Sequence, residues 1–217
     1  HVLCEKPMHP EAEAGVALVE AAKASGKTLT ICHVLRYSPF FTQIKKLLDE
    51  GRIGQAGSVQ HIESVGFFHQ AHSFVRGNWR SSRESSPMIL QKSCHDMDIL
   101  LWLLGKHCLQ VSSFGSLTHF TPENAPAGST ERCLDGCPHT ATCPYYCARL
   151  YEEDAAGFRR VVSLDDSPEA VTQALKTGPY GRCVYRCDND VVDHQVVNLL
   201  FEGGVTASFT MCAFTQR

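Results

Sequence analysis

The 217-residue sequence predicts an α/β segment followed by a larger α+β segment. The opening residues 1–34 suggest a strand, a helix and a second strand, which together make half of a parallel α/β unit. After residue 37 the pattern changes to alternating strands that suit an antiparallel sheet. Because a parallel sheet of two strands is too small to be stable, we expect further strands of the same domain ahead of His1.

A helix between two short apolar runs defines the first segment. The end of a buried strand is expected at residues 1–4 and a second buried strand at residues 28–34. The helix is predicted over residues 10–25, with Pro10 near its start and Gly26 as its stop. The predicted domains are therefore residues 1–36 and residues 37–217.

Short helices and strands alternate in the second segment. A Glu202-Gly203-Gly204 turn between the last two strands is typical of a hairpin. A long irregular stretch is expected to reach residue 146. The pattern predicts helices at residues 40–50, 88–104 and 168–176, and strands at 58–68, 109–120, 183–187, 194–201 and 205–214.

Composition and charge narrow the class of partner. With 20 basic and 23 acidic residues the net charge is -3, which offers no footprint for nucleic acid or an anionic membrane. No apolar run reaches the roughly 18 residues needed to span a bilayer, and the given residues do not begin with the charged start and apolar stretch that mark a secretory signal. A globular protein is expected, since 43% of the residues are hydrophobic and can form a core. The charge balance favours a small-molecule partner, and the lack of a membrane or secretory pattern favours a cytoplasmic location.

Polar residues interrupt the apolar helix predicted at residues 88–104. Gln91, Lys92 and His95 share one helix face because residues three and four apart are neighbours. A polar stripe on an otherwise apolar helix is expected to line a cavity, since unpaired polar groups are costly in a dry core. The alternative is a core histidine that is satisfied by a backbone carbonyl.

Four cysteines fall within one 15-residue part of the irregular stretch. Cys133, Cys137, Cys143 and Cys147 could supply the four thiolates of a tetrahedral zinc site. The best zinc signature has two residues between paired cysteines and this chain has three, so an iron–sulfur cluster and ordinary thiols both stay open. The odd total of 11 cysteines disfavours a secreted disulfide framework.

Motifs along nearly the whole chain resemble one known family. Cys4-Glu5-Lys6-Pro7, Arg36-Tyr37-Ser38-Pro39, Asn78-Trp79-Arg80 and Cys94-His95-Asp96-Met97-Asp98 occur in the order and spacing of the glucose-fructose oxidoreductase, inositol dehydrogenase and MocA superfamily. The resemblance implies that residues 1–36 are the C-terminal remnant of a Rossmann domain that binds NAD or NADP. It also implies an open, mostly antiparallel sheet with helices on one face, which supports substrate binding and homo-oligomer contacts.

The resemblance also assigns roles to residues. Lys6 would orient and polarise the reacting hydroxyl, and His95 would accept its proton while nicotinamide takes the hydride from a sugar, polyol or related compound. Two alternatives remain open: an NAD-dependent glycoside hydrolase or lyase of the same superfamily, and a non-catalytic, metal-stabilised dimerisation or binding module. The cofactor contacts implied are Glu5, Lys6, Pro7 and Arg36, and the substrate contacts are Gln91, Lys92, Trp79 and Arg80, although Trp79 and Arg80 could instead pack a loop.

Three features depart from the family pattern. Gln91 stands where relatives often carry an aspartate, and Lys92 is a cation that would lower the pKa of His95. The usual glycine run ahead of this helix is replaced by residues 83–87. No Gly-x-Gly-x-x-Gly follows a strand, so the chain holds only the nicotinamide end of a cofactor site. By itself it is expected to bind NAD weakly or not at all.

Overall fold

The computed structural model describes residues 1–153 and 157–216, and they form two compact units. Each unit is built from separate parts of the sequence, so the domain boundary expected at residue 36 is a different division and stays a prediction. Unit 1 comprises His1–Glu63, Ser86–Phe114 and Gln195–Met211, and unit 2 comprises Ser64–Ser85, Gly115–His194 and Cys212–Arg217.

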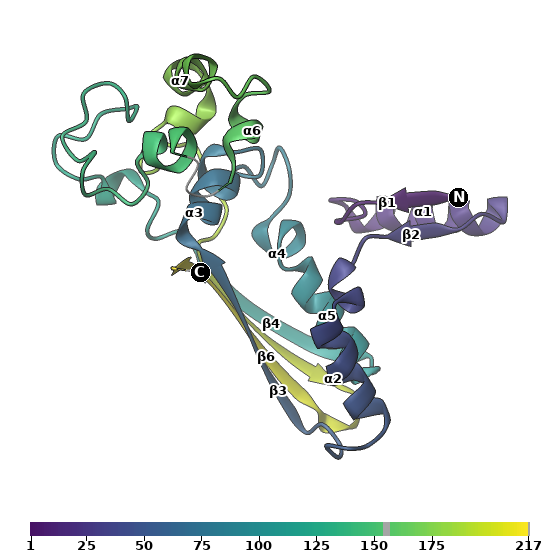
Figure 1. Cartoon of the computed structure of the whole chain (residues 1–217). Coiled ribbons are helices and arrows are strands. Elements are labelled where there is room, and N and C mark those ends of the chain that lie inside the picture. The colour runs from purple at the N-terminus through teal and green to yellow at the C-terminus, as the bar shows by residue number, and fades with distance from the viewer. Residues whose placement is uncertain (154–156, 217) are drawn as a thin grey trace. The chain divides into compact units, whose positions relative to one another are not determined.

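The N-terminal part of unit 1 is the expected strand, helix and strand (Figure 1). Strands β1 (Val2–Cys4) and β2 (Leu29–Ile31) pair in parallel, and helix α1 (Ala12–Ser25) connects them. Helix α1 ends at Gly26, whose φ of 62° is the left-handed conformation that glycine adopts readily. In the described residues these two strands are not buried, since Leu3 is 74% exposed and a sheet of two strands cannot enclose a core.

The helices that follow begin where the sequence indicates. A 3-10 helix, η1 (Val34–Tyr37), leads into α2 (Pro39–Asp49). The Ser38 hydroxyl caps α2 by accepting a hydrogen bond from the main-chain nitrogen of Phe41 at 3.3 Å. Pro39 occupies the first turn, where its missing N–H costs nothing.

The helix predicted over residues 88–104 is broken into two. Helix α4 (Met88–Gln91) ends at Lys92, and α5 (Cys94–Leu104) begins after Ser93. The main-chain nitrogens of Lys92 and Ser93 both bond to the carbonyl of Met88, so one turn is wider than an α-helical turn. This break places Gln91 and His95 on separate helices rather than on one continuous face.

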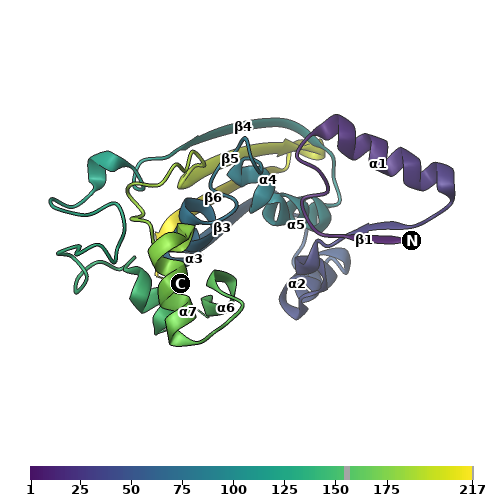
Figure 2. The same ribbon diagram turned by 90° about the horizontal axis from the view of Figure 1, so that it is seen from above.

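The four-stranded sheet has the order β3-β6-β5-β4. A hairpin with Gly203 at a φ of 75° joins β5 to β6 through η6 (Glu202–Gly204), as the sequence predicted. Helices α2 and α5 lie on one face of this sheet in both Figure 1 and Figure 2, and β4 is exposed along its whole length. The strands are β3 (Ser58–Gly66), β4 (Cys108–Ser116), β5 (His194–Phe201) and β6 (Thr206–Thr215).

Unit 2 consists of short helices around two apolar clusters. The π-helix η2 (Gln70–Arg76) is buried at every residue, and no helical periodicity in the sequence predicted it. The strand predicted at residues 183–187 is wrong, because a turn hydrogen bond from Arg186 to Cys183 folds the chain back there. The other elements are α3 (Phe67–His69), η3 (Pro122–Asn124), η4 (Ala148–Glu152), α6 (Arg159–Val162), α7 (Pro168–Thr177) and η5 (Pro179–Gly181).

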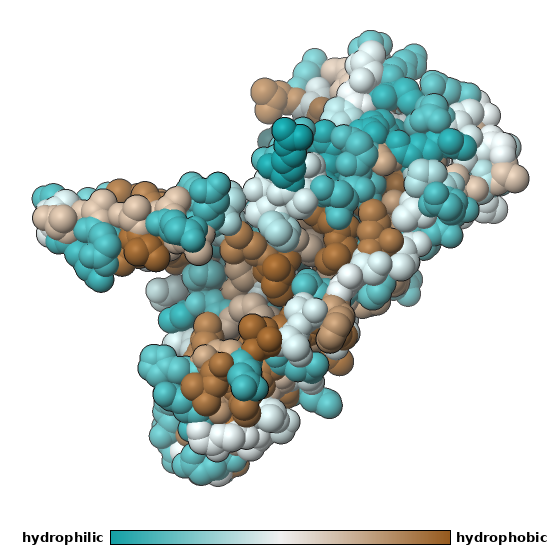
Figure 3. All heavy atoms as spheres, turned by 180° about the vertical axis from the view of Figure 1, so that it is seen from behind, coloured by the Kyte–Doolittle hydropathy of each residue, from teal (hydrophilic) through white to brown (hydrophobic). Residues whose placement is uncertain are grey.

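The surface is mixed in polarity. Apolar residues form brown patches between polar regions in Figure 3. Large apolar side chains such as Ile62, Val111 and Phe114 stay more than 60% exposed. No helix in the described parts of the chain is both long and apolar enough to cross a membrane.

Candidate active site

Two candidate residues follow the ends of neighbouring parallel strands. Cys4, the last residue of β1, is in register with Ile31, the last residue of β2. Lys6 and His33 each come two residues later, at the carboxyl edge where ligands bind to parallel sheets. His33 was missed by the sequence analysis, although its place after a predicted strand was a usable signal.

Lys6 connects the N-terminal part of unit 1 to the break between α4 and α5. Its Nζ donates a hydrogen bond to the main-chain oxygen of Gln91 at 2.8 Å. The side chain of Gln91 has a different role, since its Oε1 accepts a hydrogen bond from Ser86 at 2.8 Å in a buried position. Lys6 is therefore held by the backbone, and the identity of the side chain at position 91 does not set its place.

His95 lies half-buried in the first turn of α5. Its ring meets that of His33 edge to face, with 5.8 Å between the centroids. The buried Nδ1 of His95 has no hydrogen-bond partner among the residues that the structure describes. Burial, followed by the charges of Lys6, His33 and Lys92, lowers the pKa of His95. The imidazole is therefore neutral near pH 7 and able to accept a proton.

An ion pair fixes the entry to α2 against α5. Nε and Nη2 of Arg36 donate to the two carboxylate oxygens of Asp98 at 2.7 Å and 2.5 Å, which raises the pKa of Arg36. The same carboxylate lies 3.9 Å from Nδ1 of His33. Asp98 thus places a negative charge next to the histidine pair, and the contact of Arg36 with a cofactor stays a prediction.

The other polar side chains of this region pair with strand β3. Lys92 forms an ion pair with Glu63, and His61 Nε2 lies 2.8 Å from Asp96 Oδ1. Asp96 is 2% exposed, so these contacts join α5 firmly to the sheet. The polar stripe is therefore largely satisfied by protein partners, and the predicted roles of Gln91 and Lys92 toward substrate are untested.

A hollow of about 450 Å³ opens beside these residues in unit 1. Its lining includes Pro7, His33, Leu90 and Cys94, together with residues of α1. Pro7 is half-buried and Glu5 is exposed. His33 therefore faces an open hollow, whereas Lys6 and the predicted polar stripe of Gln91, Lys92 and His95 are not among the residues that line it.

The remaining predicted substrate residues belong to unit 2. The rings of Trp79 and Phe74 lie 6.3 Å apart, and Arg80 Nε donates to Asp188 at 3.0 Å. These contacts favour the interpretation that Trp79 and Arg80 pack their own loop. Their contact with substrate stays a prediction.

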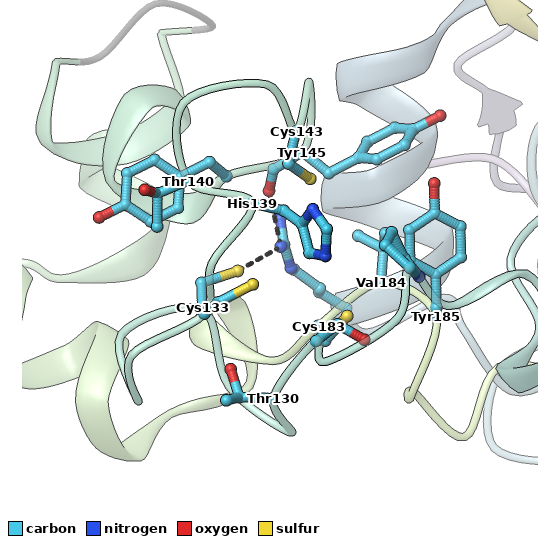
Figure 4. Close-up of a pocket in the computed structure, with 14 residues that line it drawn as sticks. Thr130, Cys133, His139, Thr140, Cys143, Tyr145, Cys183, Val184 and Tyr185 are labelled. Atoms are coloured by element: carbon cyan, nitrogen blue, oxygen red, sulfur yellow. Dashed lines mark hydrogen bonds between the residues drawn. The ribbon is translucent and has the colours of Figure 1, made fainter.

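The four clustered cysteines are free thiols, and three of them line a cavity that Figure 4 shows. Cys147 is instead fully buried beside Leu150 and Tyr151. Within the described residues, no group of three or more histidine, cysteine, aspartate or glutamate side chains has a geometry that could hold a metal ion. The zinc and iron–sulfur interpretations are thus not supported.

Known proteins share both the sequence and the fold. The chain is 29% identical over 216 residues to YteT of Bacillus subtilis, which carries the name of an oxidoreductase; the match covers 97% of this chain and 49% of YteT. It is 31% identical over 113 residues to an inositol 2-dehydrogenase of Saccharopolyspora erythraea, covering 52% of this chain and 30% of that protein. The chain therefore spans about half, or less, of the length of these curated relatives.

A solved structure extends the likeness to the fold. The myo-inositol 2-dehydrogenase of Lactobacillus plantarum superposes with a TM-score of 0.56 at 14% identity, covering 99% of this chain and 44% of that one. The model of the family described as oxidoreductase family, C-terminal alpha/beta domain, matches residues 45–216. The protein belongs to this oxidoreductase family, and most of the chain is its C-terminal α/β domain.

Proposed function

We propose that the protein is an NAD(P)-dependent oxidoreductase that transfers a hydride between nicotinamide and a hydroxyl-bearing carbon of a sugar, polyol or related compound. Family membership supports the reaction class. The relative named as an inositol 2-dehydrogenase supports the substrate class. Lys6 and His95 are the proposed catalytic residues.

One observation carries the proposal. Lys6 is anchored by its 2.8 Å hydrogen bond at the carbonyl of Gln91, immediately ahead of the helix that begins with Cys94 and His95. An ammonium and a neutral imidazole are the two groups that oxidation of an alcohol requires, one to orient the hydroxyl and one to remove its proton. Lys6 and His95 come from distant parts of the sequence, and only the fold brings their two motifs together. This supports a shared function for the two residues.

Each residue has a definite chemical task. The Lys6 ammonium donates to the substrate oxygen and stabilises the charge that develops there as the proton leaves. His95 accepts the hydroxyl proton on a ring nitrogen, and the negative charge of Asp96 favours the charged imidazolium that forms. When bound, NAD or NADP supplies the nicotinamide carbon that takes the hydride.

The residues present fit the nicotinamide end of that cofactor. The hollow lined by Pro7 and His33 leaves space for a bound group. The buried Nδ1 of His95, which does not line this hollow, has no hydrogen-bond partner among the described residues. Glu5, Lys6 and Pro7 would contact the cofactor there. No Gly-x-Gly-x-x-Gly motif follows a strand in this sequence, so these residues do not account for binding of the pyrophosphate.

The test is nicotinamide reduction by the intact protein across a panel of polyols and sugars. We expect absorbance of the reduced cofactor to rise in proportion to product. Conversion of substrate without net cofactor reduction would favour the hydrolase or lyase alternative, in which oxidation is transient. Silence across the panel, with cofactor binding demonstrated, would falsify the oxidoreductase proposal.

We also propose that the protein self-associates through the open face of its sheet. Ile62 on β3, Val111 on β4 and Val196 on β5 are each at least 41% exposed and apolar. Burying such a face is favourable at about 25 cal/mol per Å² of apolar surface. Sedimentation of the intact protein should show an oligomer, and Val111→Lys should shift it toward the monomer, whereas Lys23→Glu on α1 should not.

A further inference from the structure

Arg76 is a buried cation without a carboxylate partner. It is 0% exposed at the end of η2, where Nε donates to the carbonyl of Arg182 at 2.7 Å and Nη2 donates to the carbonyl of Tyr145 at 2.8 Å. Carbonyl oxygens satisfy its protons but do not neutralise its charge. Nη1 is buried and has no hydrogen-bond partner among the described residues. An uncompensated buried guanidinium is costly, so an anion is expected beside it.

The groups around Arg76 that could supply this charge are thiols and a phenol. Nη2 also donates to Sγ of Cys133 at 3.4 Å, and the titratable groups whose charge acts on Arg76 are Tyr151, Cys133, Cys147 and Cys187. No aspartate or glutamate is among them. Burial raises the pKa of Tyr151 to about 12, which keeps its hydroxyl neutral at physiological pH.

Cys133 is the thiol that this environment favours as a thiolate. Its hydrogen bond with the Cys147 thiol, followed by the charge of Arg76, lowers its pKa against the opposing effect of burial. The pKa of Cys147 is raised, first by that hydrogen bond and then by burial. Burial also raises the pKa of Cys143 and of Cys183, so these two thiols stay protonated.

A small cavity gives access to Cys133. Figure 4 shows Cys133, Cys143 and Cys183 on different sides of it, with a dashed line marking the hydrogen bond between the guanidinium and the Cys133 sulfur. The cavity has about 20 Å³ of free volume, which suits a molecule the size of water. A small polar oxidant of the hydroperoxide class could therefore reach the sulfur, whereas a bulky disulfide could not.

We propose that Cys133 and Cys147 form a peroxide-reactive dithiol in which the Cys133 thiolate, paired with Arg76, is oxidised and then closes a reversible disulfide with Cys147. The Cys133 sulfur attacks one oxygen of hydrogen peroxide, the O–O bond breaks, and hydroxide leaves and is protonated to water. The Cys147 sulfur then attacks the sulfenic acid on Cys133, the S–O bond breaks, and the thiol proton of Cys147 leaves with that oxygen as a second water. The two sulfurs lose two electrons and the peroxide gains them.

The charge of Arg76 also predicts how easily the disulfide is reduced. Oxidation removes the thiolate and leaves the buried guanidinium without its anion. Stabilisation of the reduced form in this way makes a disulfide strongly oxidising and readily reduced. The bond is therefore expected to open again under mild thiol reductant, which distinguishes it from a structural disulfide.

The test is oxidation of the reduced intact protein with a small excess of hydrogen peroxide, followed by mass spectrometry. Cleavage before Asp135 separates Cys133 from the other three clustered cysteines, and fragmentation of the linked peptides then shows which of the three is its partner. We expect a Cys133–Cys147 link that dithiothreitol reverses. At pH 7, hydrogen peroxide should oxidise Cys133 about tenfold faster than the exposed Cys108, because thiolate and not thiol is the nucleophile.

Matched variants separate the two thiols. Cys147→Ser keeps a hydroxyl donor to Cys133 but cannot form the disulfide, so oxidation should stop at a sulfenic acid, which adds one oxygen atom to the mass of the peptide that contains Cys133. Cys147→Ala removes the donor and should slow the oxidation of Cys133 by peroxide, whereas Cys108→Ser should leave both the link and the rate unchanged. These variants change one atom or a small side chain, so they test the proposal even if substitutions of Arg76 prevent folding.

Three results would each overturn the proposal. The first is a link from Cys133 to Cys137 or Cys143 in place of Cys147. The second is oxidation of Cys133 by hydrogen peroxide no faster than that of Cys108. The third is stoichiometric metal in the purified protein that shields the clustered thiols from peroxide.

Discussion

The ammonium of Lys6 donates a hydrogen bond to the main-chain oxygen of Gln91, a residue 85 positions away in the sequence. A carbonyl is present whatever the side chain at that position. The glutamine that replaces the family's usual aspartate therefore does not displace Lys6. Glutamine carries no negative charge, and the pKa of His95 is lowered first by burial and then by the charges of Lys6, His33 and Lys92.

Lys6→Met should both weaken turnover and raise the pKa of His95. The lysine charge is the largest cause of the lowered pKa after burial, so its loss makes imidazolium easier to form. Titration of the His95 ring protons by NMR measures the shift. Lys23→Met is a matched control, since Lys23 is exposed on α1 and pairs with Glu20. An unchanged His95 titration in Lys6→Met would contradict this electrostatic account.

The pH profile of kcat/KM should fall on the acid side at a pH below the ordinary histidine value of 6.5. The active form of His95 is neutral, so activity is lost as pH drops through its lowered pKa. Lys92→Met removes a further cation and should move this limb toward higher pH. A limb that stays in place, or that moves to lower pH, would show that Lys92 does not act on His95.

Arg36→Lys should destabilise unit 1 although it keeps the positive charge. The guanidinium makes two parallel hydrogen bonds to Asp98, and lysine cannot reproduce this fork. Hydrogen bonds to charged groups suggest a loss of about 1–2 kcal/mol in the free energy of unfolding. Urea unfolding measures it. Lys46→Arg, in the exposed pair with Glu50, should change stability very little.

His72 should make the stability of unit 2 depend on pH. Its ring is 4% exposed and stacks between Phe158 and Tyr180, and burial lowers its pKa from 6.5 to about 4. The unfolded chain therefore binds more protons than the folded one between these values, so the free energy of unfolding falls as pH falls. The full loss is roughly 3 kcal/mol.

The measurement is a series of urea unfolding curves from pH 7 to pH 4. In His72→Phe, which keeps an aromatic ring in the stack, the free energy of unfolding should fall less between pH 7 and pH 4, and the difference from the parent protein should be close to this full loss. Equal slopes for the variant and the parent protein would show that His72 is not held neutral by its surroundings.

Elements with local start and stop signals could be predicted from the sequence. Strand β5 was predicted at its observed bounds because the Glu202-Gly203-Gly204 turn fixes its end. Helices α2 and α7 begin at a serine cap followed by proline. The break at Lys92 and Ser93 was missed because neither glycine nor proline marks it; the break depends on tertiary contacts such as the pair of Lys92 with Glu63.

The residues of the candidate site also include some that could be predicted from the sequence and some that could not. Lys6 and His95 were found because they lie in short motifs with a family resemblance. Glu63 and Asp98 could not be given partners, since their ion pairs join residues distant in the sequence. Burial of Arg76 was likewise invisible, because a charged residue at the end of an aperiodic segment is normally expected on the surface.

The most direct test of the account is turnover by His95→Ala in the intact protein, with cofactor affinity measured on the same sample. Loss of a positioned base should lower kcat by about 10²- to 10⁴-fold while the Kd for NAD or NADP stays within about twofold of the parent value. Lys106→Ala, at a partly exposed lysine beyond the C-terminal end of α5, is the control and should retain full activity. Near-normal turnover in His95→Ala would contradict the account, because the proton acceptor would then lie elsewhere.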